Sequence, residues 1–132
     1  AGMIALTKDQ KTKRVDKFFI GADALLNKGI LNKVGSGMLS RIAWENKIPV
    51  YVFSDSWKYT KEKVKIEQRS FLEVWKSSSK PETLKIKNPA FEFVPKKYIK
   101  AIVSEHGILS YDEFLKKCNS KKSKKERKMK ND

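Results

Sequence analysis

The chain has 132 residues, of which 39% are hydrophobic, and its formal net charge is +15. This length suits one compact domain, and the hydrophobic content lies in the range of folded proteins. No apolar run approaches the roughly 20 residues of a membrane span, which argues against a membrane protein. Cys118 and His106 are each the only residue of their kind, so we expect no disulfide, no metal site and no cofactor, in a cytoplasmic protein.

Short apolar segments alternate with polar ones in the first part of the chain. Residues 2–6 and 17–20 are predicted to be strands, and residues 30–31 a brief third one. Residues 38–46 carry apolar side chains at three- and four-residue spacings, which predicts a helix. Residues 49–53 form a nearly continuous apolar run, typical of a strand that is covered on both faces.

The second part of the chain predicts further elements of both kinds. Residues 64–68 and 84–87 alternate as strands do, on either side of a loop at 77–81. Residues 96–105 are predicted to be a helix that ends before Gly107, because their apolar residues share one helical face.

The last element is a short helix with a capping box at Ser110 and Glu113, expected to end near Lys117. Together the elements predict an α/β fold. We expect a Rossmann-like, three-layer domain over residues 1–117, with a mostly parallel twisted sheet and helices on both faces.

Residues 118–132 are predicted to be a disordered basic tail, because they lack an apolar face. From Lys116 to Asp132 there are nine Lys and Arg and two acidic residues. Such a tail attracts RNA, ribosomes or acidic proteins through its charge and through counterion release, so weak nonspecific RNA contact is one expectation. The alternative is a solubilising end without a specific partner.

Asp23 is the first candidate for chemistry. It follows the predicted strand at 17–20 and should lie at the carboxyl edge of a parallel sheet, where open α/β folds bind ligands. A partly buried carboxyl group with a raised pKa suits proton transfer. The alternative is an aspartate that caps the following turn.

The other candidates are suited to an anionic ligand. Asn32 and Lys33 precede Gly35 and Ser36, which open the predicted helix. The free N–H groups and the dipole at such a helix start favour a phosphate, of a sugar or of a nucleotide. The pattern is neither a Walker A loop nor a dinucleotide fingerprint, so a tight turn with a serine cap is the alternative. Lys58 could hold a second phosphate or be a surface lysine.

Several motifs follow one another in a specific order between residues 15 and 113. They are Gly21-Ala22-Asp23, Asn32-Lys33, Gly35-Ser36, Ile48–Val52, Asn88–Pro95 and Ser104–Gly107. In this order they resemble the translation initiation factor 2B alpha/beta/delta family, which includes methylthioribose-1-phosphate and ribose-1,5-bisphosphate isomerases. Residues 64–67 are most similar to the archaeal members.

The resemblance implies a Rossmann-like C-terminal domain that pairs into homo- or heterodimers. It also implies that Asp23 is the catalytic acid/base of the isomerases and that Asn32 and Lys33 contact their substrate. Their second catalytic group is a cysteine upstream, after an N-terminal helical domain, and we expect this chain to lack both. The chain by itself is therefore not expected to be an enzyme.

Three functions remain open after this comparison, one of which is a nucleic-acid binder that uses the tail at Lys121–Lys130. Of the other two, the first is a regulatory or interaction module of an archaeal translation initiation factor 2B-like protein, linked to initiation factor 2 by resemblance. The alternative is the substrate-binding half of a sugar-phosphate aldose–ketose isomerase. Both expectations place Asp23, Asn32 and Lys33 in one notch at the carboxyl edge of a parallel sheet.

Overall fold

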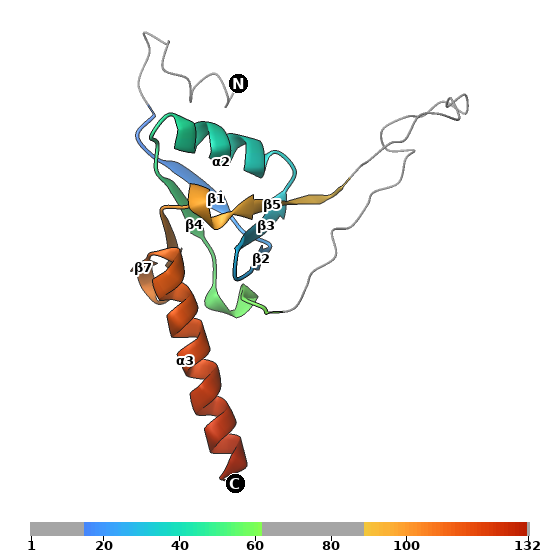
Figure 1. Ribbon diagram of the computed structural model, residues 1–132, viewed down its shortest axis with the longest axis vertical. Coiled ribbons are helices and arrows are strands. Elements are labelled where there is room, and N and C mark those ends of the chain that lie inside the picture. The colour runs from blue at the N-terminus through green and yellow to red at the C-terminus, as the bar shows by residue number, and fades with distance from the viewer. Residues whose placement is uncertain (1–14, 62–88, 132) are drawn as a thin grey trace, which may run out of the picture.

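The computed structural model describes residues 15–61 and 89–131 (Figure 1). The elements predicted at 2–6, 64–68 and 84–87, and the loop at 77–81, lie outside these ranges.

The larger sheet contains four strands, in the order β1-β4-β6-β7. Strands β1 (Phe18–Gly21), β4 (Val50–Phe53) and β6 (Ala101–Ser104) run parallel to one another, and β7 (Gly107–Leu109) pairs antiparallel with β6. The predicted α/β class and the mostly parallel sheet are confirmed for this part of the molecule. The strands predicted at 17–20 and 49–53 are confirmed as β1 and β4.

A second sheet, which the sequence analysis did not predict, is entirely antiparallel. It joins β2 (Ala24–Leu25), β3 (Gly29–Lys33) and β5 (Phe91–Pro95), in that order. The chain leaves β1, turns back through the β2–β3 hairpin and enters α2 (Ser36–Glu45), the helix expected at 38–46. The brief strand expected at 30–31 is the middle of β3.

The polar C-terminal segment is helical, so the prediction of a disordered tail is wrong. Helix α3 runs over Tyr111–Lys130, and the Ser110 side chain accepts a hydrogen bond from the N–H of Glu113, as the capping box predicts. The first turns of α3 pack into the core through three buried side chains, Tyr111, Phe114 and Cys118. Lysine, arginine and glutamate have high helix propensity and extend the helix from that anchor, and basic side chains near its end suit the helix dipole.

The helix predicted over 96–105 is also wrong. The segment forms a short 3-10 turn, η3 (Lys96–Tyr98), and then the central strand β6. A strand that is apolar on both faces puts hydrophobic residues at the same spacings as one helical face, so periodicity could not separate the two. Gly107 adopts φ 92° where β7 begins, after a tight turn, and does not cap a helix.

The core lies on one face of the larger sheet. Three strand residues, Ile20, Val52 and Ile102, belong to one hydrophobic cluster with Phe114 of α3. Val50 belongs to a second cluster, with Ala43 of α2. The opposite face carries Phe19, Tyr51, Phe53 and Ile108, of which three are largely exposed. Within the described ranges both helices therefore pack on the same face, and the predicted helix layer on the other face is not seen.

The Tyr111 hydroxyl joins α3 to the β2–β3 hairpin. It contacts the carbonyl oxygens of Leu26 and Gly29, which flank the turn of that hairpin. Burial raises the pKa of this hydroxyl, so it stays protonated and able to donate. The contact links residues more than eighty positions apart and fixes the hairpin beside the helix.

Tyr111→Phe should lower the free energy of unfolding by about 1–3 kcal/mol, because the Leu26 carbonyl oxygen loses the Tyr111 donor and the Gly29 carbonyl oxygen keeps only the Leu26 N–H. Urea denaturation followed by circular dichroism measures the change. Tyr98→Phe is the matched control, since it removes the same atom from a half-buried ring that packs 5.4 Å from Trp44, and should change stability by less than about 0.5 kcal/mol. Equal stability of Tyr111→Phe and the wild type would contradict the assigned role.

Candidate functional site

Asp23 lies where expected, just beyond the carboxyl end of β1, but it is exposed and not partly buried as predicted. Its backbone N–H donates to the carbonyl oxygen of Leu31 at 2.8 Å, which places the backbones of Asp23 and Asn32 side by side. The Lys58 ammonium group donates to the carbonyl oxygen of Ala22 at 3.1 Å, one residue before Asp23. Three predicted residues from three chain segments thus meet around the end of β1.

Asn32 and Lys33 do not act as the predicted pair. They lie on β3, an antiparallel strand, and not at the edge of the parallel sheet. Neighbouring strand residues point to opposite faces, and accordingly the Asn32 amide donates to the Ser36 hydroxyl at 2.9 Å while the Lys33 ammonium lies 4.6 Å from the centroid of the Phe91 ring. The prediction that both side chains enter one notch is wrong.

The start of α2 is occupied by a carboxylate from the same chain. The N–H groups of Gly35 and Gly37 donate to one oxygen of Glu92 at 2.8 and 2.5 Å. Gly35 adopts φ 104°, which an L residue rarely does, and a Cβ at Gly37 would lie 3.2 Å from the Glu92 carboxyl group. The N–H groups that were predicted to be free for a phosphate are therefore bonded to Glu92.

Sequence reasoning missed Glu92, although it lies in a segment that carried the family resemblance. The residue reaches α2 because β5 pairs with β3 in a register that sets Glu92 opposite Asn32. Both side chains then point toward the helix start. A strand register across more than fifty residues is not readable from periodicity, and no local signal marked this glutamate.

Polar groups also collect at the carboxyl end of the larger sheet. A shallow hollow of about 430 Å³ opens between the ends of β4 and β6, with Lys58 and Glu105 in its lining. Glu105 accepts hydrogen bonds from the hydroxyl and the N–H of Ser56, at the start of the 3-10 turn η1 (Ser56–Lys58). These bonds, the hydroxyl first, lower the pKa of Glu105 to about 2, so the carboxylate remains ionised at neutral pH.

His106 belongs to the turn between β6 and β7. Its ring lies 3.6 Å from Glu105 and 3.5 Å from the Lys121 ammonium group. Among the described residues, no group of three or more His, Cys, Asp or Glu side chains could hold a metal ion. In the same part of the chain no helix is both long enough and apolar enough to cross a membrane.

The chemistry available around Asp23 is acid–base chemistry beside a cation. The exposed carboxylate can accept or return a proton, and the Lys58 ammonium lies next to its backbone. The Asn32 amide is oriented by Ser36 at the start of α2, on the strand whose backbone lies beside that of Asp23.

The chain is similar to several proteins of known sequence and structure. The chain is 40% identical over 114 residues to a methylthioribose-1-phosphate isomerase of Acetivibrio thermocellus, covering 78% of this chain and 33% of the relative. It is 37% identical over 103 residues to a ribose 1,5-bisphosphate isomerase of Methanocaldococcus jannaschii, covering 74% and 33%. The chain thus spans about a third of the length of these relatives.

A solved structure with a similar fold is described as a translation initiation factor and not as an isomerase. The crystal structure of the translation initiation factor eIF-2B, subunit delta, from A. fulgidus matches with a TM-score of 0.66 and 29% identity, over 78% of this chain and 33% of that one. The model of the initiation factor 2 subunit family matches residues 6–111. On these matches, the chain belongs to the initiation factor 2 subunit family.

Proposed function

We propose that this chain carries the acid–base part of a sugar-phosphate isomerase site. The observation that supports this most directly is that the segments carrying Asp23, Lys58 and Asn32 come together at the end of β1, through the bonds to the Leu31 and Ala22 carbonyl oxygens. The two curated relatives described above are named as isomerases of methylthioribose-1-phosphate and ribose 1,5-bisphosphate. Because the chain spans a third of their length, the complete site would also use residues outside this region.

An aldose–ketose interconversion fits these groups without a cofactor. An aldose 1-phosphate is a closed ring at C1, so the ring C1–O bond breaks as the ring oxygen takes up a proton. A base then removes the proton from C2, C1 gains a proton, and the C2 hydroxyl loses its proton to become the ketone, so that one C–H bond breaks and one forms. In this proposal the Asp23 carboxylate carries that proton. The Lys58 ammonium stabilises the negative oxygen that develops between the two steps, and the Asn32 amide orients a hydroxyl group.

The phosphate group has a different place in this proposal from the one that the sequence suggested. With Glu92 on the N–H groups of α2, an anion at that helix start would meet a carboxylate. Lys58, whose ammonium group lies on the carbonyl oxygen of Ala22, is the cation beside Asp23 that could contact it. Glu92 then acts as a positioning residue, because it fixes the loop that carries Ser36 and, through it, the Asn32 amide.

The second candidate is an interaction module of a factor 2B-like protein that engages initiation factor 2. The observation that favours it is the open face of the larger sheet. Phe19 stands edge-on to Tyr51 and Phe53, at centroid distances of 5.9 and 5.1 Å. Exposed aromatic rings on a flat face are typical binding hot spots, and we propose that a second copy of this chain covers them in a dimer.

Asp23→Asn in the full-length gene product should lower the rate of ribose-1,5-bisphosphate or methylthioribose-1-phosphate conversion by about 10²–10⁴-fold, because an amide cannot carry the proton. A coupled assay or NMR of the sugar signals measures conversion. Asp16→Asn is the matched control, since Asp16 is exposed at the opposite end of β1. Full activity of Asp23→Asn would end the isomerase proposal.

Glu92→Ala should lower the free energy of unfolding by about 1–3 kcal/mol, because two N–H groups at the start of α2 lose a charged acceptor. Glu92→Gln keeps an oxygen in place and should lose less. Urea denaturation gives the stabilities, and hydrogen exchange of the Gly35 and Gly37 amides should speed up in the alanine variant. Unchanged exchange at both amides would contradict the positioning role.

Phe19→Ser with Phe53→Ser should shift the chain from dimer to monomer, because the change removes two of the rings on the open face. Sedimentation equilibrium measures the dissociation constant, which should rise at least about tenfold for such a loss of aromatic contact. Trp44→Ser, an equally exposed ring on α2, should leave it unchanged. A wild-type chain that stays monomeric at high concentration would contradict the dimer.

A further inference from the structure

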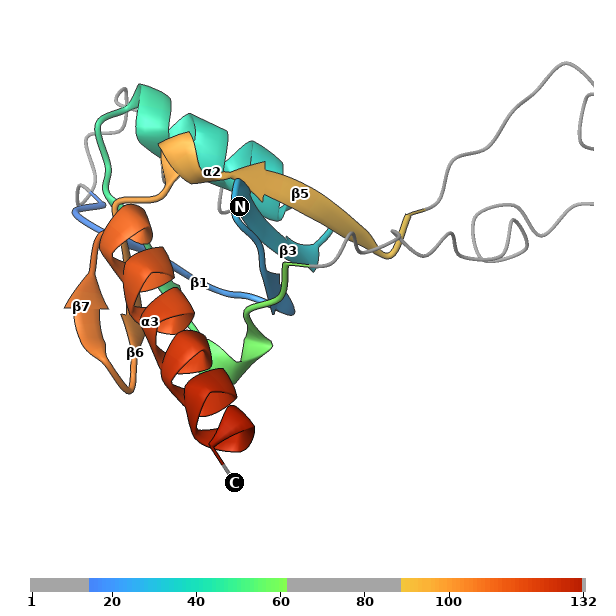
Figure 2. The same cartoon turned by 60° about the horizontal axis from the view of Figure 1, so that its bottom comes forward.

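The C-terminal half of α3 stands away from the rest of the molecule. In Figures 1 and 2 the C-terminal end of α3 extends beyond the two sheets. Buried side chains end at Cys118, and every side chain described from Lys121 to Asn131 is exposed. The first turns of α3 therefore belong to the core, and the later turns contact solvent.

This free half is strongly basic and is not balanced by its own acidic groups. Lys124 and Lys128 are four residues apart and share one side of the helix, as do Lys121 and Lys125. Glu126 is the one acidic residue in the sequence between 121 and 130, against seven Lys and Arg. Like charges at this spacing oppose the helix, so an anionic partner with several charges would stabilise it.

The composition of this half argues for a phosphate backbone as the partner. A helix that lies on a membrane needs a face of large apolar residues, and Met129 is the one such residue after Cys118. Protein interfaces favour aromatic residues and arginine and are depleted in lysine. Closely spaced lysines without apolar neighbours suit the phosphates of a nucleic acid, whose binding is largely electrostatic.

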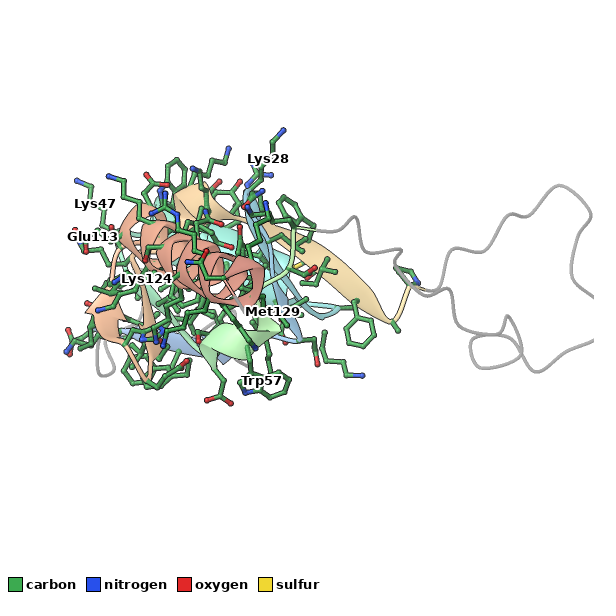
Figure 3. All side chains as sticks on the ribbon, turned by 90° about the horizontal axis from the view of Figure 1, so that it is seen from below. Lys28, Lys47, Trp57, Glu113, Lys124 and Met129 are labelled. Carbon is green, nitrogen blue, oxygen red and sulfur yellow. The ribbon has the colours of Figure 1, made fainter. Side chains whose placement is uncertain are left out.

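An exposed tryptophan lies beside the point where α3 leaves the core. Trp57, in η1, is 75% exposed, and the Lys58 ammonium lies 5.8 Å from its ring centroid. Two residues later, the Tyr59 hydroxyl lies 3.5 Å from the Asn119 side chain of α3, which places η1 against the helix. Figure 3, which looks at the molecule from below, shows Trp57 pointing outward beside α3.

We infer that α3 residues 121–130 and Trp57 form one binding surface for a single-stranded nucleic acid. The lysines hold the phosphate backbone along the helix, and Trp57 stacks on one unpaired base. Stacking on an exposed ring requires a base that is free of its duplex, and it tolerates any base, so binding is expected to be independent of sequence. This surface involves neither Asp23 nor the open face of the larger sheet.

The full chain and a labelled twelve-nucleotide oligouridine test the inference by fluorescence anisotropy. With about five phosphate contacts, the association constant should fall roughly 100-fold between 50 and 200 mM salt. Oligothymidine of the same length tests whether ribose is required. Equal binding of the two oligonucleotides is expected, because phosphate contact and base stacking need no ribose hydroxyl group. Tighter binding of a duplex, of polyglutamate or of anionic vesicles would overturn the inference.

Two pairs of variants separate phosphate contact from stacking. Lys124→Gln with Lys128→Gln should reduce the slope of log K against log salt by about 1.4, whereas Trp57→Ala should weaken binding by about 5–100-fold and leave the slope unchanged. Lys47→Gln with Lys97→Gln and Trp44→Ala make the same changes on exposed residues elsewhere and should have no effect. Wild-type binding by Trp57→Ala, or an unchanged slope in the lysine variant, would contradict the surface.

Discussion

One carboxylate joins the second sheet to the start of α2. Glu92, on β5, accepts from the N–H groups of Gly35 and Gly37 at the start of α2, more than fifty residues earlier in the chain. The bond satisfies backbone donors that a helix start leaves open and brings a negative charge to the positive end of the helix dipole. It also fixes the loop that carries Ser36, and with it the orientation of the Asn32 amide. The candidate site therefore depends on a contact that belongs to the fold.

The arrangement around Asp23 has a similar origin. The parallel strand β1 delivers Asp23 to the edge of the larger sheet, and the β2–β3 hairpin then folds back so that Leu31 accepts from the Asp23 N–H. Lys58 follows β4 in the chain, and its ammonium group donates to the carbonyl oxygen of Ala22. An antiparallel hairpin attached to a parallel sheet thus gathers groups that neither sheet alone would bring together. Tyr111 holds that hairpin in place from α3.

Two surfaces of the molecule have no part in this site. The aromatic face of the larger sheet is apolar and flat, and it lies opposite the core. The C-terminal half of α3 differs from it in chemistry, since this half is basic and Met129 is its one large apolar residue. Parallel sheets are normally covered on both faces, and a long lysine-rich helix repels itself. Among the described residues, the two exposed surfaces therefore differ in chemistry, one apolar and one basic.

The sequence by itself determined the α/β class, the strands β1 and β4, the helix α2, the cap at Ser110 and the family, because local periodicity, caps and ordered motifs carry that information. It also placed Asp23 correctly at the end of β1. Only the tertiary structure decided that residues 101–104 are a strand, that Asn32 and Lys33 point apart, and that Glu92 fills the start of α2. Those outcomes depend on strand register and on which segment pairs with which, and the residues that set them lie too far apart in the chain for any local pattern to show.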